Sequence, residues 1–371
     1  RLLTCIPAML LCYWCFGYGA WLCLALMLAA GIIAHHQKLS ALLAVGILLL
    51  PATQYPATTW WSKPDLDREY VLSLDVEHYF GNIQKMRKHL ETDRQILWVT
   101  YYRNLYNATH PSEINSPVSL SRNLLAWNQP GTNGLILPVN PSASFLSILF
   151  ANELWFTLGD MTMAEHCAML SMIFSPRNSG SRMIKRLAEI NLVNGDDEAA
   201  LKYLRILDKT LLHKSWAEKR IPGQQTPRVK EWLEKKRRDI PTQDQLRSGN
   251  DAVTSLQNLV ASNAGNLRAY EYLLCYHLLS KDLRSFVEDY VPGKVSSPIF
   301  AEALLIHLAR QGNIRAEELI KYQIPVEIAK EFADYTRLYE AKDTSLKEKY
   351  GKTYWFYYHF ATTEPGKESK P

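Results

Sequence analysis

The stretch LVNGDDEAAL, residues 192–201, decides the fold of most of this chain. Apolar residues recur at helical spacing on both sides of it, which predicts one helix over Arg182–Val193 and a second over Glu198–Leu212. Gly195 and Asp196 lie between them, and a glycine followed by a capping residue is typical of one helix ending and another beginning. The stretch therefore predicts a helix–turn–helix unit.

The same punctuation returns along the chain, at Gly81-Asn82, Gly159-Asp160 and Gly312-Asn313. The predicted pairs are Tyr70–Phe80 with Ile83–Glu91, Phe145–Leu158 with Thr162–Met172, and Pro298–Arg310 with Arg315–Tyr322; Leu267–Leu279 and Leu283–Tyr290 form a pair without the glycine. The four glycines are separated by 78, 36 and 117 residues. These separations are close to two, one and three times a repeat length in the high thirties of residues. Such a period is typical of helical-repeat arrays.

The first part of the chain has a different character. The run from Leu2 to Ala34 has no charged residue, and a second apolar run follows over Leu39–Leu50. About 20 apolar residues suffice to cross a bilayer, so these runs predict two or three transmembrane helices. Because the chain opens on Arg1 directly before an apolar run, we expect them to end a longer multi-pass region. A cleaved signal peptide fits less well, because the first run is too long and a second follows it.

These patterns predict a transmembrane segment over residues 1–61, a soluble helical domain over 62–361 and a disordered tail over 362–371. Lys38, with His35 and His36 beside it, favours a cytoplasmic loop between the apolar runs under the positive-inside rule. The next span would then deliver the soluble domain to the periplasmic side of a bacterial inner membrane.

Two resemblances add to this interpretation. Ala200 follows Gly195 by five residues, as Ala164 follows Gly159, and this turn resembles that of a tetratricopeptide repeat, where a small residue lies at the helix contact. The aromatic and proline positions of that repeat are not matched, so the units are degenerate. With its ending YGKTYWFYY, residues 350–358, the whole chain resembles an uncharacterised multi-pass membrane-protein family of Bacteroidota. The resemblance implies an all-α fold, with transmembrane helices followed by a tetratricopeptide-like α-solenoid, and no known activity.

The chain lacks the common motifs of catalysis and of nucleotide or metal binding after residue 61, so we predict no catalytic residue, no cofactor and no metal site. Repeat arrays mostly bind other molecules, which favours a binding protein over an enzyme. Asn128–Ser144 interrupts the helical pattern with three prolines and two glycines. Its apolar centre, Leu135-Ile136-Leu137, indicates a segment that lies across the helices rather than a free loop.

The segment Lys209–Asp239 contains ten Lys or Arg residues and four Asp or Glu, although the whole chain has a net charge of only +5. Its densest run is Lys235, Lys236, Arg237 and Arg238. Three interpretations stay open: contact with anionic lipid, contact with an acidic protein partner, or a solvated helix face. No nucleic-acid partner is expected.

The end of the chain is rich in aromatic residues, at Tyr354, Trp355, Phe356, Tyr357 and Tyr358. Such a surface is either a cap that closes the last repeat or a docking site on a membrane or a partner.

The sequence therefore predicts a membrane-anchored repeat protein that acts as a scaffold for a protein or peptide. Its binding face would be the concave side, formed by the first helix of each pair. The alternative is a soluble accessory domain of a membrane enzyme or transporter whose active site lies in upstream transmembrane helices.

Overall fold

The structure is a computed structural model, and it describes residues 63–91, 96–110, 121, 124, 132, 134–139, 144–175, 180–242 and 251–361. Helices and turns make up these ranges, without any β-strand, which confirms the all-α class. The predicted transmembrane segment 1–61 and the predicted tail 362–371 lie outside them. Among the helices described, none combines the length and the hydropathy that a membrane span requires.

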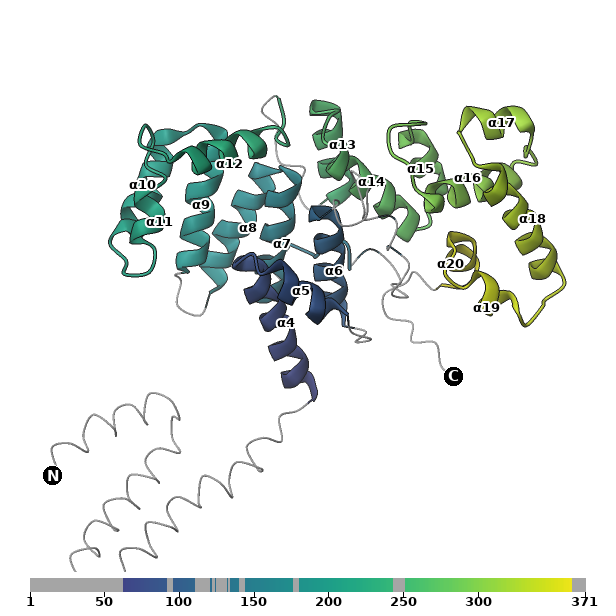
Figure 1. The fold of residues 1–371 in the computed structure, drawn as a ribbon, viewed down its shortest axis with the longest axis horizontal. Helices are drawn as coiled ribbons and strands as arrows, with labels where there is room; N and C mark the ends of the chain where they lie inside the picture. Colours follow the sequence, from purple (N-terminus) through teal and green to yellow (C-terminus); the bar gives the residue numbers. More distant parts are fainter. Residues whose placement is uncertain are drawn as a thin grey trace, which may run out of the picture. The chain divides into compact units, whose positions relative to one another are not determined.

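The chain divides into two compact units, Arg1–Leu72 and Ser73–Pro371. Figure 1 labels the helices, whose numbering begins at α4. They are α4 (Lys63–Tyr79), α5 (Ile83–Leu90), α6 (Leu97–Thr109), α7 (Phe145–Leu158), α8 (Met161–Phe174), α9 (Ser181–Asn194), α10 (Asp197–Asp208), α11 (Lys214–Glu218), α12 (Pro227–Arg237), α13 (Ala252–Ser262), α14 (Leu267–Leu279), α15 (Leu283–Asp289), α16 (Pro298–Arg310), α17 (Ala316–Lys321), α18 (Val326–Glu340), α19 (Leu346–Tyr350) and α20 (Tyr354–Phe360).

The turn at Gly195 and Asp196 joins α9 to α10. Gly195 ends α9 with φ of 82°, in the left-handed region that favours glycine. The side chain of Asp196 then accepts a hydrogen bond of 2.9 Å from the amide of Ala199 and begins α10. Gly159 and Asp160 do the same between α7 and α8. The helix–turn–helix prediction is confirmed at both places.

Two turns differ in detail from the prediction. Lys281 has φ of 60° between α14 and α15, so a lysine adopts the conformation that glycine takes elsewhere. The amides of Lys281, Asp282 and Leu283 all donate hydrogen bonds within this turn, which stabilises the left-handed conformation of Lys281. Asn82 stands at the start of α5, but its side chain makes no capping hydrogen bond.

Consecutive helices pack on one another. Helices α7, α8, α9 and α10 are in contact pairwise in chain order, and so are α13, α14, α15 and α16 (Figure 1). Helix α16 also contacts α18 and α20. Ala164 and Ala200 are fully buried, and the Asn152 side-chain amide on α7 donates a 2.6 Å hydrogen bond to the Ala164 carbonyl on α8. A small residue therefore stands where α8 approaches its partner.

The C-terminal end of α7 contacts helices that lie much later in the sequence. Three side chains from later in the chain donate to its last carbonyl groups: Lys236 to Phe156 at 3.4 Å, Arg268 to Thr157 at 3.1 Å, and Asn266 to Leu158 at 2.7 Å. Carbonyls at a helix end lack partners within the helix, so these bonds replace the missing ones. They fix α12 and the start of α14 to α7.

Candidate functional site

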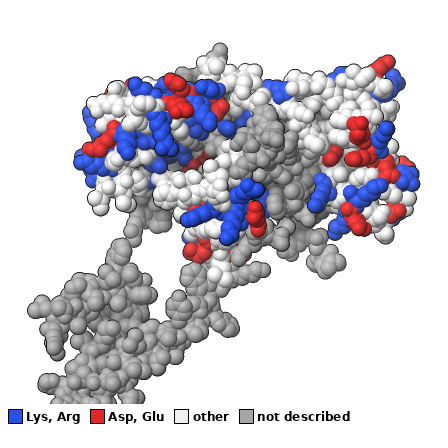
Figure 2. Space-filling model, viewed as in Figure 1, with Lys and Arg blue, Asp and Glu red and all other residues white. Residues whose placement is uncertain are grey.

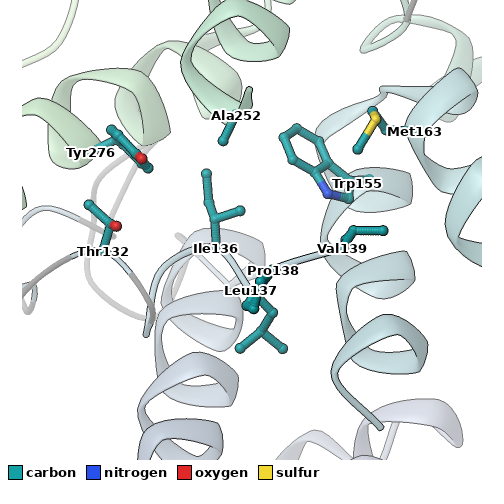
Figure 3. A pocket seen from close by; sticks show the side chains of 9 residues that line it. All are labelled: Thr132, Ile136, Leu137, Pro138, Val139, Trp155, Met163, Ala252 and Tyr276. Carbon is teal, nitrogen blue, oxygen red and sulfur yellow. The ribbon is translucent and has the colours of Figure 1, made fainter. Parts of the chain in front are cut away.

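A cavity of about 170 Å³ lies where the non-helical segment 134–139 meets α7 and α14 (Figure 3). The residues that line it are Thr132, Ile136, Leu137, Pro138, Val139, Trp155, Met163, Ala252 and Tyr276. They come from five places in the sequence, so the cavity exists only in the folded unit.

Helix side chains hold the segment that forms one wall of the cavity. The Asn104 side-chain amide on α6 donates a 2.9 Å hydrogen bond to the Gly134 carbonyl, and the Ser147 hydroxyl on α7 donates to the Pro138 carbonyl at 3.2 Å. Leu135 and Leu137 are buried. The helices thus bind a non-helical stretch of chain by its backbone carbonyls and its apolar side chains.

Trp155 contributes a buried polar atom to the wall of the cavity. Its side chain is only 1% exposed, and its indole Nε1–H makes no hydrogen bond to any described residue. Figure 3 shows the indole nitrogen on the edge of the ring that faces Pro138 and Val139. The indole nitrogen can only donate, and a buried donor without an acceptor costs about 1–3 kcal/mol. The indole N–H is therefore an unsatisfied donor buried in the wall of the cavity, and an acceptor on a ligand would reach it only if neighbouring side chains moved.

The size and lining of the cavity limit what it can hold. Most of the lining side chains are apolar, although polar atoms form about half of the exposed wall, and the described lining residues include no carboxylate, imidazole, amine or thiol. A dry cavity of about 150 Å³ holds a benzene-sized molecule, whereas typical ligand pockets measure about 300–1,000 Å³. This cavity therefore has room for one apolar side chain of a ligand. The ligand would also have to supply the hydrogen-bond acceptor for Trp155.

A buried ionic cluster lies on the other side of α7. Arg182 donates to both carboxylate oxygens of Asp75, at 2.5 and 2.9 Å, and to Glu153 at 2.7 Å. Arg186 donates to the second Glu153 oxygen at 2.6 Å, and the Tyr102 hydroxyl donates to Asp75 at 2.5 Å. These contacts tie α4, α6, α7 and α9 together.

The charges in this cluster are mutually compensated. Burial alone would raise the pKa of Glu153, but Arg186 and Arg182 hold that pKa well below its usual range. The carboxylate stays ionised and both its oxygens are occupied, so it is poorly suited to act as a general acid or base. We infer that the cluster has a structural role and holds these helices together.

The four consecutive cations of the basic segment do not share one role. Lys236 stacks over the Phe156 ring at 4.6 Å besides donating to the Phe156 carbonyl, and burial lowers its pKa to about 8. Arg237 donates to the Val193 and Leu192 carbonyls at the end of α9, at 3.0 and 2.8 Å. Lys235 and Arg238 are exposed. Only these two leave their charged groups available for an outside partner without breaking a contact that holds helices together.

The aromatic ending also divides. Tyr354, Trp355 and Tyr357 are buried, whereas Phe356 and Tyr358 are partly exposed. The Trp355 indole donates to the Glu302 carbonyl at 3.0 Å. The hydroxyls of Tyr354 and Tyr357 donate to the last carbonyls of α14, those of Leu278 and Leu279, at 2.9 and 2.8 Å. Helix α20 is thereby fixed to α14 and α16; whether it also docks a partner stays a prediction.

Sequence reasoning singled out the segment around Ile136 but not Trp155 or Ala252. The run FLSILFANELWFTL of α7 is apolar almost all round, so its periodicity does not distinguish one face. Asn152 and Glu153 are buried polar residues in the middle of that run. They are the sequence feature of α7 that indicates polar contacts on this helix.

Comparison with known proteins gives one match. A model described as a family of unknown function, DUF6057, matches residues 41–361. No curated protein and no solved structure matches the chain.

Proposed function

The chain belongs to the DUF6057 family, and from that premise we propose that it is a membrane-anchored helical-repeat protein that binds a peptide or protein partner. The observation that carries the proposal is the Trp155 cavity. It joins mostly apolar lining side chains to an unused indole N–H, and it lies beside a chain segment that the helices already hold.

The partner chemistry follows from that pairing. A peptide supplies a backbone carbonyl as acceptor close to every side chain, and a leucine-sized side chain suits the available volume. Asn104 and Ser147 hold the carbonyls of segment 134–139 in the same manner. We propose that a partner segment binds beside this segment, with one aliphatic side chain in the cavity and one carbonyl accepting from Trp155.

The architecture in this proposal is an α-solenoid built from degenerate tetratricopeptide-like pairs. The left-handed glycines at 159 and 195 and the buried alanines at 164 and 200 support it. The apolar runs 2–34 and 39–50 support anchoring in a bacterial inner membrane, and Lys38 supports a periplasmic position for the helical domain.

A cavity-filling variant tests the proposal. The full chain in lipid nanodiscs is used to select from a phage library of random peptides, in parallel with Ala252→Leu and Ala261→Leu. Ala252 lines the cavity, whereas Ala261 is exposed at the other end of α13, so the two variants add the same side chain to one helix.

The expected result is a set of peptides that share one large aliphatic residue and bind the unaltered chain and Ala261→Leu alike. Ala252→Leu should lose them, and Trp155→Phe should weaken them several-fold by removing the donor. Selected peptides that bind all variants equally would contradict the proposed site.

A further inference from the structure

The connection between α10 and α11 presents two adjacent leucines to solvent. Leu211 is 97% exposed and Leu212 is 85% exposed. Ile206, two residues before the end of α10, is also exposed. Single exposed leucines are ordinary, but two neighbours that project almost completely from a turn form an apolar tip that water solvates poorly.

The tip is held outward by hydrogen bonds of its own turn. The Thr210 hydroxyl donates to the Leu207 carbonyl at 2.7 Å and accepts from the His213 amide at 3.1 Å. The Lys214 amide donates to the Thr210 carbonyl at 3.2 Å. These bonds fix the conformation of the turn on both sides of Leu211 and Leu212.

The leucines are not displaced core residues. Beneath the turn, Leu204 and Leu207 of α10 pack with Ala188 and Ala217, and all four are buried. The core under the tip is therefore complete without Leu211 or Leu212.

Cations outnumber acids in the stretches of chain on either side of the tip. Between residues 202 and 219 the chain has five cations and two acids. The cations are Lys202, Arg205, Lys209, Lys214 and Lys219, and all are exposed. On the face drawn in Figure 2, Lys and Arg outnumber Asp and Glu over the α9–α12 region.

We propose that the α10–α11 turn is a membrane-docking tip, which places Leu211 and Leu212 among the acyl chains of an anionic bilayer while the neighbouring cations contact the headgroups. A fluid bilayer accepts projecting side chains of any shape, whereas a protein partner would need a matching pocket. The exposed cations in residues 202–219 complement anionic headgroups. The inference uses only the described turn and stands whether or not the Trp155 cavity binds a peptide.

Photo-crosslinking of the full chain tests this directly. Leu212→p-benzoyl-phenylalanine and, as a matched control, Ile320→p-benzoyl-phenylalanine are reconstituted separately into vesicles of phosphatidylcholine with phosphatidylglycerol, and into phosphatidylcholine alone. Ile320 on α17 is 77% exposed, so both sites tolerate the probe, and its flanks lack the five-cation cluster.

Mass spectrometry after irradiation should find lipid adducts at residue 212 at least about fivefold above those at residue 320 in the anionic vesicles. The excess should fall in phosphatidylcholine alone, and also when Lys202, Lys209 and Lys214 are each changed to Gln. Lipid adducts at residue 212 no more frequent than at residue 320 would overturn the proposal. Adducts at residue 212 that are mainly protein would overturn it in favour of a protein interface.

Discussion

Gly159 lies so close to Asp239 that a Cβ atom on residue 159 would stand 2.3 Å from the Asp239 carbonyl oxygen. Gly159 ends α7, and Asp239 follows α12, so this contact is part of the junction at which α12 and α14 meet α7. Glycine serves two purposes here, because its φ of 92° is also in the left-handed region.

Gly159→Ala should lower the free energy of unfolding by roughly 3 kcal/mol or more, since the new methyl group must displace backbone and adopt a strained φ. Gly195→Ala is the matched control, because Gly195 has φ of 82° but no atom within 4 Å of the added Cβ. It should cost only about 1 kcal/mol. Denaturant unfolding followed by circular dichroism measures both. Equal losses would mean that the approach to Asp239 is unimportant.

Arg237→Gln should destabilise the helical unit by about 1 kcal/mol. Arg237 donates to the last carbonyls of α9, and its positive charge interacts favourably with the negative C-terminal end of that helix. Lys235→Gln, two residues earlier on α12 and exposed, should change stability by less than about 0.5 kcal/mol. Thermal unfolding of the two variants compares them. A larger loss from Lys235→Gln would contradict the assignment of these cations.

Glu302 should make the docking of α20 sensitive to pH. Burial raises the pKa of Glu302 to about 7 from a model-peptide value of 4.5, and the carboxylate accepts from the Tyr354 amide at 2.5 Å. A raised carboxyl pKa contributes stability that is present below 4.5 and lost as pH rises through 7. The free energy of unfolding attributable to Glu302 should therefore fall between about pH 5 and pH 8.

Glu302→Gln keeps an acceptor for Tyr354 and removes the titration, so its difference from the unaltered chain isolates this effect from His359 and other groups. Glu348→Gln, exposed on α19, is the control and should leave the pH dependence unchanged. Urea titrations at several pH values give the comparison. A pH dependence that survives in Glu302→Gln would refute the assignment.

Truncation after Lys349 should lower the melting temperature sharply or make the chain insoluble. It removes the buried side chains of Tyr350, Tyr354 and Trp355, and burial of a large apolar side chain stabilises by roughly 1.5–3 kcal/mol. Truncation after Ala361 keeps every described contact of α20 and should leave the melting temperature nearly unchanged. If the shorter chain melts normally but loses partner binding, the aromatic ending is a docking surface rather than a cap.

The helices were predictable where local signals were strong. The predicted bounds Leu267–Leu279 and Pro298–Arg310 match α14 and α16, because a capping asparagine or an N-terminal proline and a polar turn mark their ends. The left-handed residue at Lys281 was not predictable as such, since lysine carries no local signal for that conformation.

The site was less accessible, because its parts are distant in sequence. Ala252 and Ile136 are far from Trp155 in the sequence, and all three line the same cavity only after the helices have packed together. Arg237 was interpreted as part of a charge patch, yet it donates to a helix end 44 residues earlier. Charge runs and apolar helices indicate composition along the chain, whereas their partners depend on tertiary packing.

The NMR signal of the Trp155 indole proton reports directly on whether the cavity binds a peptide-like ligand. In the full chain labelled with ¹⁵N-tryptophan, ten indole signals are expected, and Trp155→Phe identifies the one that belongs to the cavity. On addition of N-acetyl-leucinamide, which pairs a leucine side chain with carbonyl acceptors, this signal should move downfield and saturate. In Ala252→Leu it should not respond. A Trp155 signal that stays in place at every concentration, or moves equally in Ala252→Leu, would contradict the account.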